Sequence, residues 1–259
     1  MIIAHVSDLH IGGSDASADR AVRVRDYLNG LPGPVADVVV TGDIANHGLV
    51  EEYEIAREAM CYDAPTIVCP GNHDSRAEFR KVLLDEPGGT GPGTGTGPGP
   101  VNQVLRLDDG LTVVLCDSSI PGRHDGYLDD GTIAWLDAEL AGADGPVLVG
   151  MHHPPVALGL PSVDAIRLTH PERLADVLAR HRHAKAVLAG HAHTAASAVF
   201  AGVPLVVAPG VVSTLMLPEE RMLPEGWTED DALDFDLPPA ISLHVFDGER
   251  LVSHTRVVR

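Results

Sequence analysis

The sequence predicts an α/β protein in which two β-sheets pack against each other and helices cover them. Strand-like apolar runs alternate with helical patterns through the first half of the chain, as expected for strands joined by helices. The second half contains more strand-like runs, several of them separated by short Gly-containing turns. A chain of 259 residues can bury a substantial core, so we expect a single domain over residues 1–259.

The strands of the first half are short runs rich in Val and Ile that end near Gly or Pro. The second helical pattern carries Glu51, Glu52 and Glu54 near its start, where the helix dipole favours negative charge. Asp74 and Ser75 are candidate caps for the third helix. We predict strands near 2–6, 36–41 and 66–69, and helices near 17–30, 48–61 and 75–84.

The second half contains predicted hairpins and strand-and-helix units. One hairpin turns at residues 108–110, a second around Gly202, and the last two strands turn at Asp247-Gly248. We predict strands at 101–107, 111–116, 146–150, 185–189, 195–201, 203–208, 240–246 and 250–258, and helices at 130–141 and 171–181.

Two segments fit neither pattern. Residues 87–100 consist almost entirely of Gly, Thr and Pro, a composition that forms neither helix nor strand. We interpret this segment as a flexible surface loop within the domain, with a lid over the active site as the alternative. Residues 210–239 are acidic and contain Pro, and we expect them to be irregular.

Net charge narrows the class of substrate. The formal net charge is −19, and the sequence contains no stripe of Lys and Arg. Proteins that bind long nucleic acids gain affinity by neutralising phosphates with basic residues. The chain is therefore poorly equipped to bind a nucleic acid polymer, and we expect a small substrate.

The length of the apolar runs and the spacing of the cysteines indicate the cellular compartment of the protein. No apolar run approaches the roughly 18 residues that a membrane span needs, and the first residues enter a predicted strand without a secretory signal pattern. Cys61, Cys69 and Cys116 form no CxxC motif, and we interpret them as free thiols or small buried residues. We predict a cytoplasmic protein.

Clusters of His, Asp and Asn directly follow five of the apolar runs. Alone, each cluster is weak evidence, because a single His after a strand is often structural. Together they hold too many ligands for one metal ion and about the right number for two. A carboxylate such as Asp43 can bridge two ions, and the Asn72 amide adds a neutral oxygen ligand. The clusters are Asp8-Leu9-His10, Gly42-Asp43, Gly71-Asn72-His73-Asp74, Met151-His152-His153 and Gly190-His191-Ala192-His193.

This order of motifs resembles the calcineurin-like metallophosphoesterases. It is most similar to class III cyclic nucleotide phosphodiesterases and related glycerophosphodiesterases, and the resemblance extends from Ile2 to about Val207. The resemblance implies a four-layer αββα sandwich with a dinuclear metal centre at the strand ends. A homodimer is an expectation from the resemblance only.

The resemblance also implies a role for each residue of the clusters. His73 would contact the substrate phosphate, and Asp74 would either orient the His73 ring or cap the following helix. Fe and Mn are the metals expected first, with Zn or Co as alternatives. One ion would be held by Asp8, His10, Asp43 and His193, and the other by Asp43, Asn72, His152 and His191.

The expected activity is hydrolysis of a small phosphodiester. Two cations about 3.5–4 Å apart can share a water, lower its pKa and present hydroxide to phosphorus. We expect a 3′,5′-cyclic nucleotide, cAMP first, with a glycerophosphodiester or a broad range of phosphoesters as the alternative. A repair-type nuclease fits the acidic charge poorly. A catalytically silent metal-binding module would be marked by loss of His73 or of a ligand, and neither is lost.

Several histidines outside the proposed ligand set have structural interpretations. His5 is expected in the core or at a sheet edge, and His153 is expected to orient a loop rather than to bind metal. His47 is a candidate for lining the pocket, as is Asn46. His124 and His244 are expected at the surface or at an edge.

Overall fold

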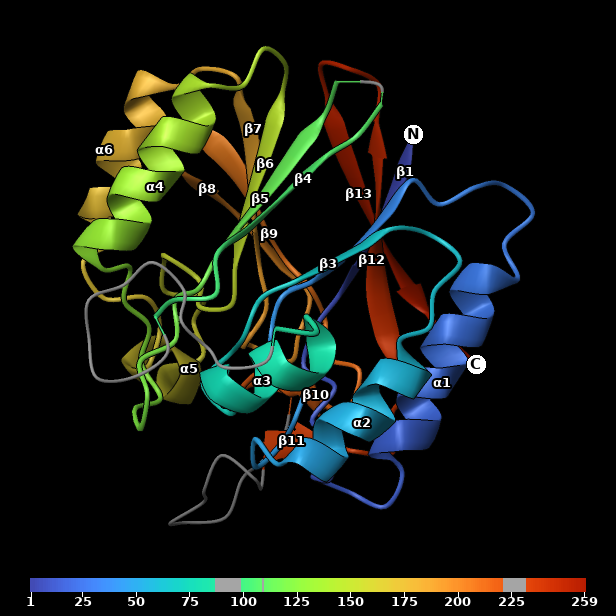
Figure 1. Cartoon of the computed structure of the whole chain (residues 1–259). Helices are drawn as coiled ribbons and strands as arrows, with labels where there is room; N and C mark the ends of the chain where they lie inside the picture. The colour runs from blue at the N-terminus through green and yellow to red at the C-terminus, as the bar shows by residue number, and fades with distance from the viewer. Residues whose placement is uncertain (87–98, 109, 221–231) are drawn as a thin grey trace.

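The computed structural model describes residues 1–86, 99–108, 110–220 and 232–259. Its described part contains two large mixed sheets that pack face to face, with helices on their outer faces (Figure 1). This arrangement confirms the predicted αββα sandwich. The Gly/Thr/Pro loop predicted at 87–100 lies outside the described residues from 87 to 98.

The five-stranded sheet has the amino-terminal strand at its centre. Strand β1 pairs in parallel with β2 and antiparallel with β12. Parallel β3 and antiparallel β13 form the two edges. In spatial order the strands are β13 (Leu251–Val257), β12 (Ala240–Phe246), β1 (Ile2–Val6), β2 (Asp37–Val40) and β3 (Thr66–Val68).

The six-stranded sheet has four parallel strands flanked by two antiparallel ones. Strands β5, β6, β7 and β9 run parallel, and the predicted hairpins are present as β4–β5 and β8–β9. In spatial order the strands are β4 (Gln103–Arg106), β5 (Thr112–Cys116), β6 (Val147–Met151), β7 (Ala184–Ala189), β9 (Val203–Val207) and β8 (Ala196–Phe200).

Alternation of side chains along the strands produces the four layers. On β2, Val39 points into the interface between the sheets, while Val38 and Val40 pack with the helices α1 (Ser17–Asn29), α2 (Val50–Ala59) and α3 (Arg76–Leu83). On β6, Leu148 likewise enters the interface between the sheets. Helices α4 (Asp130–Ala141) and α6 (Glu172–Arg180) cover the outer face of that second sheet.

Three short elements were not predicted. Helix α5 (Pro161–Ala165) lies between β6 and α6, and strands β10 (Thr214–Leu215) and β11 (Leu233–Asp234) pair antiparallel. The expectation that 210–239 is irregular is therefore wrong for these strands of its described part. Strands of two residues are too short to produce a recognisable sequence pattern. Residues 221–231 lie outside the described part.

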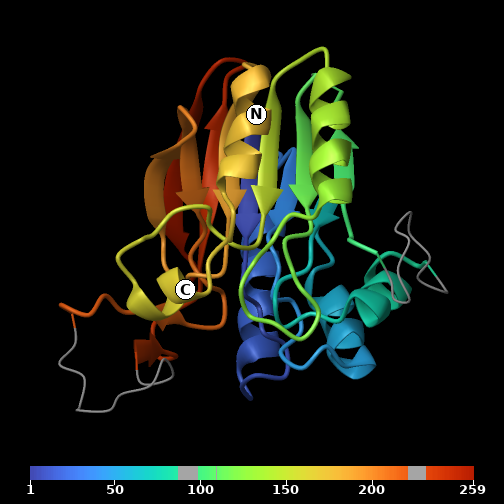
Figure 2. The same cartoon turned by 90° about the vertical axis from the view of Figure 1, so that its left-hand side faces the viewer.

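The ends of the parallel strands decide where the site can form. In both sheets the parallel strands point the same way, and Figure 2 shows the loops that follow them gathered at one end of the sandwich. Cys61, Cys69 and Cys116 are free thiols, as predicted. Within the described residues, no helix is long and apolar enough to cross a membrane.

Candidate metal centre

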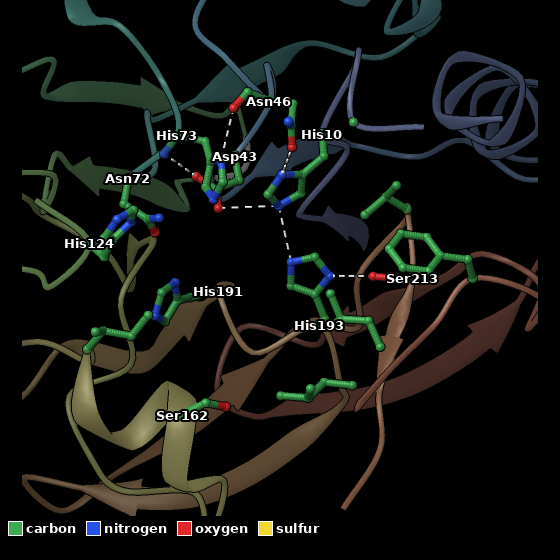
Figure 3. A pocket seen from close by; sticks show the side chains of 16 residues that line it. His10, Asp43, Asn46, Asn72, His73, His124, Ser162, His191, His193 and Ser213 are labelled. Atoms are coloured by element: carbon green, nitrogen blue, oxygen red, sulfur yellow. Dashed lines mark hydrogen bonds and ion pairs between the residues drawn. The ribbon is translucent and has the colours of Figure 1, made fainter. Parts of the chain in front are cut away.

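The five predicted clusters meet at this end of the sandwich. Those that follow β1, β2 and β3 come from one sheet, and those that follow β6 and β7 come from the other. A cavity of about 540 Å³ opens there, and its lining includes His10, Asp43, Asn72, His73 and His191 (Figure 3). His193 also lines it, whereas Asp8 and His152 are fully buried beneath.

Asp43 occupies the middle of the cluster. Its Oδ2 atom lies 3.4 Å from His10 Nε2 and 3.3 Å from His152 Nε2. Since His10 follows β1 and His152 follows β6, one carboxylate oxygen contacts imidazoles from both sheets. This geometry fits a carboxylate that bridges two ions.

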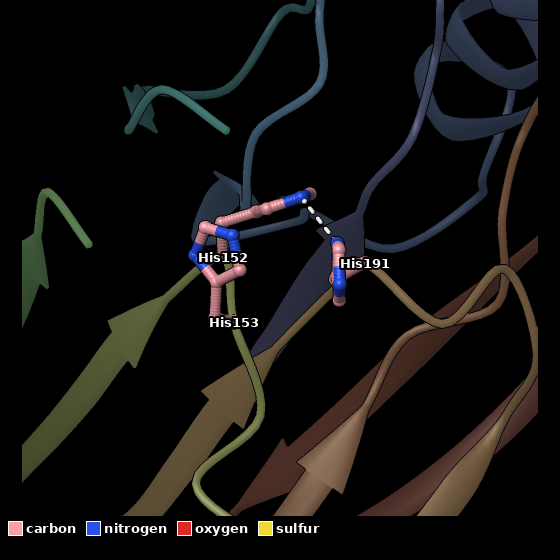
Figure 4. Close-up of side chains that lie close together, drawn as sticks. All are labelled: His152, His153 and His191. Atoms are coloured by element: carbon pink, nitrogen blue, oxygen red, sulfur yellow. Dashed lines mark hydrogen bonds between the residues drawn. The ribbon is translucent and has the colours of Figure 1, made fainter. Parts of the chain in front are cut away.

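The remaining candidate ligands divide into two groups around Asp43. His193 Nε2 lies 3.1 Å from His10 Nε2 and 3.7 Å from an Asp8 oxygen. On the other side, His152 Nε2 lies 3.1 Å from both the Asn72 Oδ1 atom and His191 Nδ1. Figure 4 shows the His152 and His191 side chains close together with their contact marked.

Hydrogen bonds on the far side of the rings turn their inner nitrogens toward the centre. His152 Nδ1 donates to the Thr41 carbonyl at 2.7 Å, and His10 Nδ1 pairs with the Asn46 amide oxygen at 3.0 Å. His193 Nδ1 contacts the Ser213 hydroxyl at 2.8 Å. The Thr41 carbonyl and the Asn46 amide oxygen require an N–H on Nδ1, so the neutral rings of His152 and His10 would offer the Nε2 lone pair to a metal, as ligating histidines commonly do.

The backbone of the candidate ligands is unusual. Five of them have φ between 43° and 70°, a region that residues other than glycine rarely adopt. Surrounding contacts hold this conformation, including the hydrogen bonds Asp8 N–H to Gly42 O and His10 N–H to Asp43 O. The five are Asp8, His10, Asp43, His191 and His193.

Glycines allow the two sheets to approach each other closely beside the ligands. A Cβ atom at Gly190 would lie 1.9 Å from Ser7 Oγ. Gly190 follows β7 and Ser7 follows β1, so the ends of these two strands approach closely here. A Cβ at Gly42 would lie 2.7 Å from His152 Nδ1. Side chains at either glycine would push the ligand-bearing loops apart.

The pKa shifts divide the candidate ligands into charged and neutral groups. Burial would raise the Asp43 pKa, but His152 and His10 outweigh it and hold this pKa well below its usual range. Burial lowers the pKa of His152, yet the Asp43 charge raises it overall to about 9. The pKa values of His191 and His193 lie well below normal, mainly because of burial.

The donor set fits two metal ions. Imidazole nitrogens that face each other at 3.1 Å can share only one proton, and His191 Nε2 is buried with no hydrogen-bond partner among the described residues. A cation would satisfy these lone pairs, since imidazole, carboxylate and amide donors together suit Fe, Mn, Zn and Co. Among the predicted ligands, Asn72 lines the cavity, and the other six belong to groups of side chains close enough to hold an ion: Asp8, His10, Asp43, His152, His191 and His193. His73 and His153 belong to such groups as well.

His73 lines the cavity beside these residues. Its Nδ1 donates to the Asn46 carbonyl at 2.9 Å, and its backbone N–H donates to Asp43 Oδ1 at 2.9 Å. The structure thus differs from the expectation that Asp74 orients the His73 ring. The carbonyl of Asn46 has that role, and burial lowers the His73 pKa.

Asp74 instead organises the backbone around the Asp43 loop. Its carboxylate accepts hydrogen bonds from the backbone N–H groups of Ile44, Ala45 and Gly71 and from the Tyr53 hydroxyl. Burial and the nearby Asp43 charge raise the Asp74 pKa to about 6. Of the two candidate caps, Ser75 is the N-cap residue of α3, although its side chain makes no capping bond, and Asp74 is not the cap.

His153 orients a loop, as we expected. The buried ring donates from Nε2 to the His124 carbonyl at 3.0 Å and contacts the Ser118 hydroxyl at 2.8 Å through Nδ1. Burial lowers its pKa to about 3. Gly126 packs directly on the ring. His124 is exposed, as predicted, and it also lines the cavity.

Two further departures concern buried polar residues. Asp117 follows β5 and forms a buried ion pair with Arg76 at 2.7 Å, although we had not singled it out. Its position directly after an apolar run was the available signal.

His244 is buried rather than exposed, and its Nε2 lies 3.2 Å from His5 Nδ1 across the β1–β12 pair. Of the two pocket candidates, Asn46 lines the cavity and His47 instead contacts Glu52.

Comparison with curated proteins identifies relatives that cover between 82% and 98% of the chain. A glycerophosphodiester phosphodiesterase from Enterobacter lignolyticus is 34% identical over 98% of this chain and 90% of its own length. A probable cyclic nucleotide phosphodiesterase from Rhodococcus erythropolis is 36% identical over 82% of this chain and 71% of its own. A cAMP/cGMP dual specificity phosphodiesterase from Mycobacterium tuberculosis is 34% identical over 82% of this chain and 68% of its own length.

Solved structures share the fold. A dimetal phosphatase from Danio rerio superposes with a TM-score of 0.74 over 100% of this chain and 96% of its own, at 16% sequence identity. The model of the calcineurin-like phosphoesterase family matches residues 1–195, which include every candidate metal ligand. This chain therefore belongs to the calcineurin-like phosphoesterase family.

Proposed function

We propose that the protein is a metal-dependent phosphodiesterase that hydrolyses a small phosphodiester, with a 3′,5′-cyclic nucleotide as the first candidate substrate. The observation that carries the proposal is Asp43, whose single oxygen contacts His10 and His152 from opposite sheets. Two of the relatives described above are named cyclic nucleotide phosphodiesterases, which supports this substrate class.

The proposed ligand sets follow the two groups around Asp43. We assign both sets to one catalytic domain over residues 1–259, with Fe and Mn as the first candidate metals. Asp43 is shared between the ions. Asp8, His10 and His193 complete one set, and Asn72, His152 and His191 complete the other.

When bound, two such cations would neutralise charge on the phosphate oxygens and lower the pKa of a water molecule. His73 would contribute through its second nitrogen. Because Nδ1–H is held by the Asn46 carbonyl, the neutral ring has its lone pair on Nε2. An anionic phosphate beside the ring favours the cationic form, so His73 would gain a proton with the substrate and return it to the leaving alkoxide.

A glycerophosphodiester is the second candidate substrate. The relative with that name matches this chain over 98% of its length, beyond the residues that carry the metal motifs. That match includes residues after 207, and some of these line the cavity. The extra coverage favours keeping this candidate beside the cyclic nucleotide.

The test compares substrates with the same protein preparation. We would measure kcat/KM of the Mn²⁺-loaded chain on 3′,5′-cAMP, 2′,3′-cAMP, glycerophosphocholine, bis(p-nitrophenyl) phosphate and p-nitrophenyl phosphate, with and without chelator. We expect preference for 3′,5′-cAMP and loss of turnover on chelation. Fast hydrolysis of the generic diester with poor cAMP turnover would reject cAMP but keep the chemistry. Absence of all turnover, or turnover that survives chelation, would contradict the proposal.

A further inference from the structure

The candidate metal ligands form one wall of the cavity, which we call the metal wall. A second wall is chemically different. It is formed largely by the segments 211–216 and 232–237, which include β10 and β11 and which we call the arm. Phe235 is 46% exposed on the arm, a large apolar surface to leave in water. The apolar residues that line the cavity are Ile166, Val212, Leu215, Leu233 and Phe235.

A buried arginine holds the arm in place. Arg20 on α1 is only 5% exposed, and its guanidinium donates to the backbone carbonyls of Val211 at 2.7 Å, Phe235 at 3.1 Å and Leu237 at 2.6 Å. These carbonyls belong to both segments of the arm. Arg20 thereby holds the arm against α1, and the Val212 N–H also donates to the carbonyl of the candidate ligand Asp8.

The lining also indicates the charge of the group that the arm can accept. Of the sixteen described residues that line the cavity, none is Lys or Arg, and Asp43 is the sole carboxylate. An anionic organic group would find no basic Lys or Arg side chain among these described residues. A choline-like cation is usually recognised by several aromatic rings, and Phe235 is the single Phe, Tyr or Trp of this lining.

We propose that the arm determines substrate choice, with Phe235 stacking on a neutral, flat organic group of nucleoside size and Arg20 acting as its positioning residue. This inference rests on the proposed phosphodiesterase function and adds the group that the diester must carry. Stacking of a base on an aromatic side chain tolerates any base, because every base has a π-face.

Two diesters with one leaving group provide the test. The p-nitrophenyl ester of thymidine 5′-monophosphate and methyl p-nitrophenyl phosphate both release p-nitrophenolate when water replaces it on phosphorus. We would measure kcat and KM for both with the full Mn²⁺-loaded chain. Phe235→Ala should lower kcat/KM for the nucleoside ester about tenfold, through KM, and leave the methyl ester within about twofold. Phe235→Trp should retain the preference.

Leu237→Ala is the matched control, because Leu237 lies on the same arm with 39% exposure and is absent from the described cavity lining. Arg20→Met should reproduce the selective rise in KM with unchanged bound metal, and should it fail to fold, the Phe235 variants decide. Equal losses on both esters, no loss for Phe235→Ala, or an equal loss for Leu237→Ala would overturn the inference. A wild-type chain that cleaves neither ester with Mn, Fe, Zn or Co would instead overturn the proposed function.

Discussion

Strand β2 has a buried aspartate at each end, and the two differ in their surroundings. Asp37 begins the strand, is fully buried, and has no hydrogen-bond partner for either carboxylate oxygen among the described residues. Burial raises its pKa to about 7. Asp43 follows the strand and is almost as buried, yet its imidazole neighbours hold its pKa well below the usual range.

The difference shows that burial alone does not produce a functional carboxylate. Taking a charge out of water favours its neutral form unless opposite charges or hydrogen bonds compensate. At the carboxyl end of β2 that compensation comes from loops of both sheets, whereas Asp37 at the amino end has no ion-pair partner among the described residues. The following predictions test this contrast, from the largest expected effect to the smallest.

The largest effect is expected from Asp43→Ala. Removal of the shared carboxylate should lower bound metal and reduce kcat/KM together, by roughly 10³-fold, since it would weaken both ligand sets. Metal analysis and steady-state kinetics on one preparation provide the measurement, with Asp37→Asn as the control. Unchanged metal stoichiometry in Asp43→Ala would exclude the bridging role.

A smaller loss is expected from His73→Ala. The ring lies beside the ligands but is proposed to act on the substrate, so turnover should fall about 10²–10³-fold while bound metal stays the same. The same two measurements apply. Full activity in this variant would remove His73 from the mechanism, and a parallel loss of metal would place it among the ligands.

Asp37→Asn should change stability rather than activity. Because the folded chain holds the Asp37 proton more tightly than the unfolded chain does, the contribution of Asp37 to the wild-type free energy of unfolding should fall as pH rises from about 4 to about 7. The amide cannot ionise, so the variant should gain roughly 2–3 kcal/mol more relative to wild type at pH 8 than at pH 5. Urea unfolding at both pH values measures this difference.

The control for Asp37 is Asp63→Asn, an exposed aspartate just before β3. Its stability relative to wild type should be the same at both pH values within about 0.5 kcal/mol. If Asp37→Asn behaves like this control, the buried carboxylate has found a partner in solution and the contrast with Asp43 is lost.

The smallest effect is expected from Asp74→Asn. The carboxylate accepts bonds from three backbone N–H groups and from Tyr53, and an amide can satisfy only some of them. We expect a loss of about 1–2 kcal/mol in unfolding free energy and less than tenfold in kcat/KM. A loss as large as that of His73→Ala would restore a direct catalytic role to Asp74.

Much of the metal wall could be predicted from the sequence, because parallel strands bring their carboxyl ends to one edge. Each cluster directly follows an apolar run, so knowing the strands of each sheet places Asp8 near Asp43 and His152 near His191. The left-handed conformation of the ligands could not be read from the pattern. It depends on hydrogen bonds between loops that are far apart in the chain.

The arm escaped prediction for a physical reason. Strands of two residues carry no periodicity, and what holds them is Arg20, which lies about 190 residues earlier in the chain. His244 escaped for a related reason: only its partner His5, on the adjacent strand, explains how its polar ring can be buried. Both failures of prediction concern contacts between segments that lie far apart along the chain.

Because the candidate ligands come from both sheets, an ion bound by them would join two layers that pack through an apolar interface. In a chain whose three cysteines are free, such an ion would be a cross-link between distant strands. Metal binding at the active site would then also stabilise the packing of the two sheets against each other. At a thousandfold excess of metal over its dissociation constant, binding would add about 4 kcal/mol to the unfolding free energy.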